Sequence, residues 1–86
     1  MRLSSRWMVL LDDRILEFLR EEGAHPPSQI ARDERIRYGE KHVGNRCLEL
    51  AQHDFLENLG NGVYQITDRG KEYLDGEYNA AAIAAR

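Results

Sequence analysis

Apolar residues recur at helical intervals in the first quarter of the chain. Their spacing of i, i+4, i+7 and i+8 predicts one buried stripe on an amphipathic helix. We expect this helix to start with Asp12 as its N-cap residue and to stop at Gly23, which favours a helix C-terminus. Residues 8–11 either extend the helix backwards or dock separately. The stripe consists of Leu11, Ile15, Phe18 and Leu19.

Two further helices follow a break at two adjacent prolines. The first is predicted over residues 28 to about 34, because the prolines interrupt the chain and favour a new helix start. A connection follows in which Ile36 is expected to enter the core. The next helix is predicted over about residues 40–53, and its apolar positions again fall on one face. These positions are Val43, Cys47, Leu50 and Ala51, and Leu48 is expected to flank them.

An Asn-Gly pair at positions 61 and 62 predicts a tight hairpin turn, because both residues tolerate a positive φ. The flanking stretches 55–59 and 63–66 alternate between apolar and polar residues, as strands of a half-buried hairpin do. The side chains expected to point inward are Leu56, Tyr64 and Ile66.

The final predicted helix has Thr67 or Asp68 as its cap and runs to about residue 75. Together the elements predict an α+β winged helix-turn-helix, with a three-helix core, a two-stranded β-hairpin wing and a C-terminal helix. We expect a single domain over residues 1–86. Within it, residues 1–10 would be an N-terminal extension and residues 77–86 an alanine-rich tail that is helical only if it packs on something.

The charge balance is unusual for this fold. Twelve Lys and Arg residues against 15 Asp and Glu residues give a net charge of -3, whereas DNA-binding domains usually carry a basic surplus. Any positive surface must therefore be local. No apolar run approaches the roughly 20 residues of a membrane helix, and the N-terminus lacks the pattern of a secretion signal. We expect a cytoplasmic protein with no membrane contact.

The helix predicted over residues 40–53 carries polar side chains on the face opposite its apolar stripe. Its candidates for contact with double-stranded DNA are Lys41, His42, Asn45 and Arg46. Their spacing places them on one side of a helix. Arg46 is suited to bond guanine through two hydrogen bonds and Asn45 to read adenine, whereas Lys41 suits a phosphate. The alternative is a solvated helix face with no partner.

Further DNA contacts are predicted from the flanking elements. At the start of the second helix, Ser28 and Gln29 would meet the phosphate backbone, although helix capping explains Ser28 equally well. Tyr38 is a candidate for contact with a phosphate or a thymine methyl group. Asn61 also has a turn role that needs no DNA. The candidates at the wing are Asn58, Asn61 and Arg69.

Other classes of site have little support in the sequence. Cys47 is the only cysteine and falls on a buried stripe, so we expect a small core side chain; a thiol sensor would need it to be exposed. No histidine and cysteine spacing suggests a metal site, and no cofactor is expected. The chain lacks a nucleophile elbow and a phosphate loop, so we expect neither an enzyme nor a small-molecule site.

Three motifs carry a family resemblance. They are Val43-Gly44-Asn45-Arg46-Cys47 with Leu50-Ala51, Gly60-Asn61-Gly62-Val63-Tyr64-Gln65-Ile66-Thr67 and Gly70-Lys71-Glu72-Tyr73-Leu74-Asp75-Gly76-Glu77-Tyr78. In this order they resemble the small winged-helix regulators of haloarchaea related to the phage phi-H repressor, themselves similar to the MarR and PadR groups. The resemblance implies a DNA-binding transcriptional regulator that acts as a repressor. The chain departs from the family at Gly39, where a serine-like cap is expected, and at His53-Asp54-Phe55, which replaces the glycine that often links the recognition helix to the wing.

We therefore expect sequence-specific binding to double-stranded DNA and repression by promoter occlusion. Because residues 7–11 and 78–85 supply apolar surface beyond the core, a homodimer on an inverted DNA repeat is expected. The alternative is a protein-interaction winged-helix adaptor whose acidic surface engages a partner and not DNA. A positive surface over the recognition helix and wing would favour DNA, and a uniformly negative one the adaptor.

Overall fold

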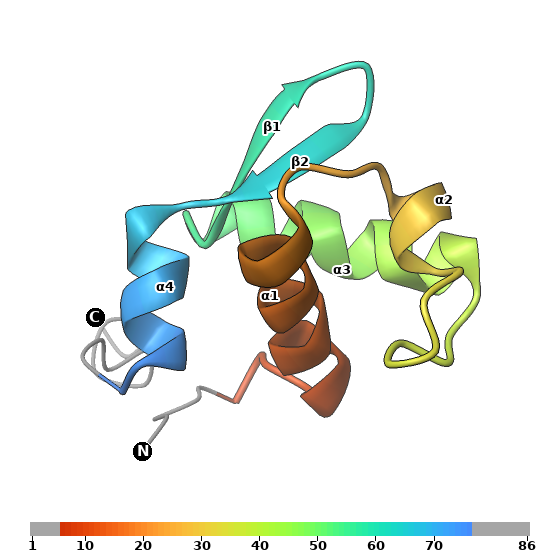
Figure 1. The fold of residues 1–86 in the computed structure, drawn as a ribbon. Helices are drawn as coiled ribbons and strands as arrows, with labels where there is room; N and C mark the ends of the chain where they lie inside the picture. The colour runs from red at the N-terminus through yellow and green to blue at the C-terminus, as the bar shows by residue number, and fades with distance from the viewer. Residues whose placement is uncertain (1–5, 77–86) are drawn as a thin grey trace.

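The computed structural model describes residues 6–76 and confirms the α+β winged helix-turn-helix. Figure 1 shows α1 in the middle, with α2 and α4 on opposite sides, α3 behind it and the hairpin above. The predicted tail over residues 77–86 lies outside the described residues. The elements are α1 (Leu10–Glu22), α2 (Pro27–Ile30), α3 (Glu40–Gln52), β1 (Leu56–Gly60), β2 (Val63–Ile66) and α4 (Asp68–Leu74).

Helix α1 begins earlier than the sequence indicates. Its N-cap residue is Val9, so the prediction that Asp12 caps the helix is wrong. Asp12 instead lies in the first turn, where its carboxylate accepts a hydrogen bond of 3.0 Å from the backbone N–H of Val9. A carboxylate at this position satisfies a helix N-terminal donor as well as a cap does. The predicted stripe is confirmed, since all four of its apolar residues are buried.

Helix α2 is shorter than predicted. It comprises only the four residues Pro27–Ile30, and Pro26 is its N-cap residue, so Ser28 does not cap it. The chain then passes through turns in which Ile36 is buried, as predicted. Helix α3 ends at Gln52, within one residue of the predicted end, and buries the predicted Val43, Cys47 and Leu50, whereas Ala51 is half-buried.

The wing is an antiparallel hairpin in which Leu56 pairs with Ile66 and Asn58 with Tyr64. Asn61 and Gly62 both have positive φ, at 54° and 74°, which confirms the predicted turn. An irregularity in the register lies between Asn58 and Gly60. Of the three side chains predicted to point inward, Leu56 and Tyr64 are buried and Ile66 is half-buried.

A single-residue β-bridge joins the segment after α1 to the wing, and the sequence pattern does not predict it. His25 pairs with Tyr64 through two backbone hydrogen bonds, of 3.0 and 3.1 Å, in an antiparallel bridge. The ring of His25 also lies edge-on to that of Phe18 in α1. The segment between α1 and α2 therefore ties the hairpin to the helical core.

The wing is set against α3 by a tight junction. Asp54 adopts a positive φ of 66° between α3 and β1, where the family resemblance leads one to expect a glycine. Thr67, the N-cap residue of α4, donates a side-chain hydrogen bond of 2.6 Å to the carbonyl of Asp54 and accepts one of 3.1 Å from the N–H of Gly70. Thr67 is thus confirmed as the cap, and its hydroxyl links the end of α3 to the start of α4.

Candidate nucleic-acid interface

Helix α3 presents one stripe of exposed side chains on the side opposite its buried face. The stripe consists of Lys41, Asn45, Leu48 and Gln52. We refer to these four residues as the outward stripe. His42 lies exposed at its edge. Because the helix packs on α1 and α2 through the other face, the outward stripe is open to a partner. The predicted exposure of Lys41, His42 and Asn45 is therefore confirmed.

Arg46 does not belong to this surface, and the prediction that it points outward is wrong. Its guanidinium Nε and Nη2 donate to the two carboxylate oxygens of Asp12, each over 2.8 Å. Nη2 also donates to the backbone carbonyl of Trp7 over 2.8 Å. The Asp12 side chain is fully buried, and the hydrogen bond to it raises the pKa of Arg46. Arg46 therefore fastens α3 to the start of α1.

Trp7 closes the same corner of the molecule. Its ring stacks on that of His53 at the end of α3, with centroids 3.8 Å apart and the planes at 6°. It also meets the ring of Phe55 at 5.8 Å. The segment before α1 thus braces both ends of the link between α3 and the wing. Trp7 belongs to the residues expected to supply apolar surface beyond the core, but it is half-buried, and its contacts join residues far apart in the chain.

The connection between α2 and α3 is held down by Arg35. Its guanidinium bonds Asp33 over 2.7 Å and Glu21 of α1 over 2.6 Å, and it lies over the Phe18 ring. The hydrogen bonds to Arg35 lower the pKa of Asp33 to about 2. The connection is therefore anchored to α1 before it reaches the first turn of α3.

Beyond that anchor, the connection presents an exposed aromatic and cationic group. The Tyr38 ring packs at a tilt on that of His42, with centroids 5.1 Å apart, so two predicted contact residues come together. Arg37 is exposed and adopts a positive φ of 60°, and Arg32 is exposed after α2. Neither arginine was predicted from the sequence as a DNA contact, although each is a cation next to the predicted recognition helix.

The remaining predicted contacts lie on α2 and the wing. Gln29 is exposed and Ser28 half-buried in α2, and Gly44 of α3 approaches Pro27 there. At the wing, the Asn58 carboxamide oxygen accepts from the N–H of Gly60, and Asn61 is exposed in the turn. Arg69 forms an exposed ion pair of 3.2 Å with Asp54. These positions stay predictions as DNA contacts.

The ion pairs of this acidic chain leave three cations near the start of α3 without a carboxylate partner. Among the residues that the structure describes, Arg32 and Arg37 between α2 and α3, and Lys41 in the first turn of α3, form no ion pair. Other arginines are neutralised by carboxylates. Those arginines are Arg14, Arg20, Arg35, Arg46 and Arg69.

The thiol of Cys47 faces the core. It is fully buried, and burial raises its pKa to about 12, with the charge of Asp12 adding to the effect. A protonated, inaccessible thiol is a poor redox sensor. The exposure that a thiol sensor requires is therefore not met.

Neither a candidate metal site nor a membrane-spanning helix is found within residues 6–76. Within that range, no group of three or more His, Cys, Asp or Glu side chains is placed to hold a metal ion. In the same range, none of the helices has the length and apolar character that crossing a bilayer requires.

The short helix α2, the outward stripe of α3 and the hairpin wing define a winged helix-turn-helix protein. The model of the winged helix-turn-helix phage repressor family matches residues 1–85. The chain belongs to this family, as the sequence motifs predict.

Two solved structures are similar to this chain. One is the PhiH1 repressor-like protein from Haloarcula marismortui, which is 46% identical, with a TM-score of 0.93 over 95% of this chain and 93% of that one. The other is the YusO protein from Bacillus subtilis, which is 22% identical, with a TM-score of 0.69 over 93% of this chain and 60% of that one. The second likeness concerns the fold alone. Among curated proteins, a search finds no match.

Proposed function

We propose that this protein binds double-stranded DNA sequence-specifically and represses transcription by occluding a promoter. Helix α3 would enter the major groove with its outward stripe, and the wing would lie along the flank. The observation that carries the proposal is the location of the unpaired cations. Arg32, Arg37 and Lys41 gather at the helix-turn-helix of a chain whose net charge is -3. Membership of a phage repressor family supports it.

The predicted contacts fall into two groups within this proposal. The outward stripe offers Asn45 to base edges, while Lys41 and the two unpaired arginines suit phosphates. Contacts that position the DNA duplex would come from α2, the connection between α2 and α3, the edge of α3, the wing and α4. The residues assigned to that second group are Ser28, Gln29, Tyr38, His42, Asn58, Asn61 and Arg69.

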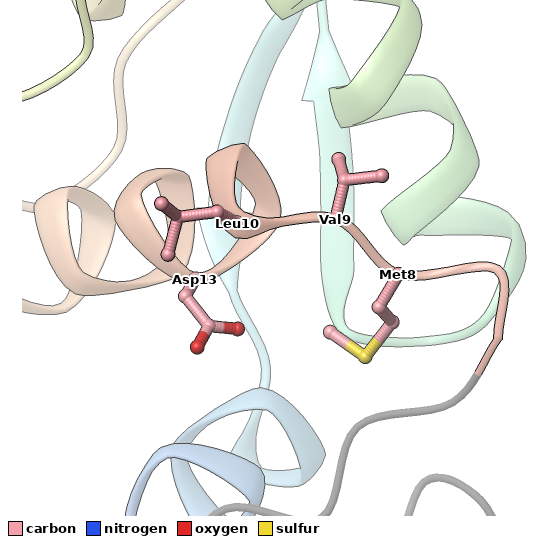
Figure 2. Close-up of a pocket in the computed structure, with 4 residues that line it drawn as sticks. All are labelled: Met8, Val9, Leu10 and Asp13. Atoms are coloured by element: carbon pink, nitrogen blue, oxygen red, sulfur yellow. The ribbon is translucent and has the colours of Figure 1, made fainter.

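We further infer that the protein works as a homodimer. Leu10 is 66% exposed and Val9 48% exposed, and Figure 2 shows Leu10 at the start of α1, with Val9 and Met8 on the segment that leads into it and Asp13 in the first turn. These four residues line a pocket of about 270 Å³. Leu11, which the sequence analysis counted among the apolar surface residues, is buried in the core and is not available for dimer contacts.

Replacing Leu10 with lysine is expected to convert the dimer to a monomer, because it places a charge in an apolar contact. Sedimentation equilibrium at micromolar concentration measures the effect. The control is Leu59→Lys at a wing residue of similar character, 50% exposed, which should leave the dimer intact. A wild-type chain that sediments as a monomer contradicts the dimer proposal.

Selection of bound fragments from genomic DNA tests the proposed function. The selection is carried out at a high KCl concentration, because the acidic composition and the Haloarcula relative support a salt-loving host. The wild type should recover a defined inverted repeat. Asn45→Ala should weaken binding by about 1–3 kcal/mol and relax the sequence at one position per half-site, because a side-chain amide reads a base edge through two hydrogen bonds.

The control for this experiment is Lys71→Ala, which removes an exposed cation from α4, outside the helix-turn-helix. Its recovered sites should equal those of the wild type. Unchanged sites with Asn45→Ala would contradict the assignment of α3. If the wild type enriches no sequence, the protein-interaction adaptor becomes the better account of the acidic surface.

A further inference from the structure

Leu48 is the apolar member of the outward stripe of α3. Its side chain is 53% exposed, whereas Leu50, two residues later in the same helix, is fully buried. Leu48 also lies outside the core cluster and outside the half-buried apolar residues that pack on it. Folding of the described part of the chain therefore gives no reason for a leucine at this position.

The neighbours of Leu48 in the stripe are two carboxamides. Asn45 precedes it by three residues and Gln52 follows it by four, so all three lie side by side on one helix face. At 1.5 Å of rise per residue, they are separated by about 4.5 and 6 Å along the helix axis. Base pairs follow one another every 3.4 Å or so, so the three side chains would face neighbouring base pairs.

The chemistry of these three groups matches one kind of base pair. Carboxamides of Asn and Gln pair with the N6 and N7 atoms of adenine in the major groove. Thymine is the base that presents an apolar group there, its C5-methyl, and apolar side chains contact it. An exposed leucine between two carboxamides is therefore complementary to A·T pairs.

We propose that Leu48 forms an apolar subsite that reads thymine methyl groups, with Asn45 and Gln52 reading adjacent adenines. This inference rests on the proposed function, because it needs α3 in the major groove. It makes the operator rich in A·T pairs beneath the second half of α3. The partner of Leu48 is thus the major groove of DNA and not an apolar protein surface.

The test replaces thymine by deoxyuridine, which lacks only the C5-methyl group, at the thymines beneath the second half of α3 in a duplex carrying the selected site. Fluorescence anisotropy at fixed salt gives the Kd for both duplexes. The wild type should bind the deoxyuridine duplex about fourfold more weakly for each methyl group that Leu48 covers, as the transfer of one methylene-sized group from water implies. Leu48→Ala should bind the thymine duplex more weakly and no longer distinguish the two duplexes.

The matched control is Leu59→Ala, at a leucine of similar exposure on the wing. It should keep the full discrimination against deoxyuridine, because the minor groove that a wing reaches carries no methyl group. Equal binding of both duplexes by the wild type would overturn the Leu48 assignment and leave DNA binding intact. Discrimination that persists in Leu48→Ala would overturn it as well. If the wild type binds neither duplex, the proposed function itself fails.

Discussion

Replacing Arg46 with alanine is expected to destabilise the folded protein by about 3 kcal/mol, because it leaves a buried carboxylate without its cation. Asp12 is fully buried and receives two hydrogen bonds of 2.8 Å from Arg46. The same change leaves the Trp7 carbonyl without the donor that it has in Arg46. Urea unfolding followed by circular dichroism measures the loss. For a domain whose total stability is on the order of 5–15 kcal/mol, it is a large fraction.

Two control variants distinguish the stability lost by leaving a buried charge unpaired from the stability lost by removing any arginine. Arg14→Ala removes an exposed ion pair with Glu17 and should cost less than about 1 kcal/mol. A double variant, Asp12→Leu with Arg46→Met, removes both charges together and should recover most of the stability, because an apolar pair can replace a buried ion pair. If Arg46→Ala is as stable as Arg14→Ala, the buried ion pair does not hold α3 to α1.

The position of Arg46 also limits what DNA-binding experiments with it can mean. A weaker complex with Arg46→Ala would follow from a loosened α3, whether or not the guanidinium meets a base. Asn45 and Leu48 are better probes, because their side chains are exposed and their removal leaves the core intact.

Replacing Gly70 with alanine is expected to destabilise the protein by about 2 kcal/mol. An added Cβ would lie 2.6 Å from the backbone carbonyl oxygen of Phe55 and 2.8 Å from the Ile66 side chain. Overpacking of this kind costs about 1–3 kcal/mol, and the backbone oxygen cannot move aside as a flexible side chain would. The clash pushes α4 away from β1, so hydrogen exchange in α4 should accelerate together with a lower urea midpoint.

Gly44→Ala is the matched control, because it makes the same change inside a helix without a clash. The atom nearest to the added Cβ would be the Cβ of Pro27, at 3.8 Å, which is an ordinary van der Waals contact. Alanine is favoured over glycine within a helix by about 1 kcal/mol, so this variant should be slightly more stable than the wild type. If both variants shift stability in the same direction, the close approach at Gly70 is not limiting.

The hairpin turn and the N-cap of α4 could be predicted because their determinants are local. Asn61 and Gly62 form a tight turn through their own tolerance of positive φ. Thr67 caps α4 through a hydrogen bond to a residue only three positions later. The buried stripe of α1 follows from helical spacing alone. None of these predictions needed to know what lies across the fold.

The candidate interface could be predicted only in part. Exposure of Lys41 and Asn45 follows from the helical period, because both lie opposite the buried stripe. Leu48 lies opposite that stripe too, but its exposure was not predicted, because an apolar residue is expected to face the core. Arg32 and Arg37 gain their importance from forming no ion pair with a described residue, which depends on how the connection between α2 and α3 is folded.

The sequence by itself determined the order of helices and strands, the apolar stripes and the hairpin turn, since each depends on residues within a few positions of one another. Only the tertiary structure decided which polar groups bond to one another inside the protein and are therefore not available to a partner. Arg46 lies four residues after the exposed His42 and four before the buried Leu50, so the helical period leaves it at the border of the two faces, and a carboxylate 34 positions away in the sequence binds it. An ion pair of that separation depends on the packing of α1 against α3, and periodicity carries no information about that packing. The surface left for DNA is therefore smaller than the sequence indicates, and it includes the exposed Leu48.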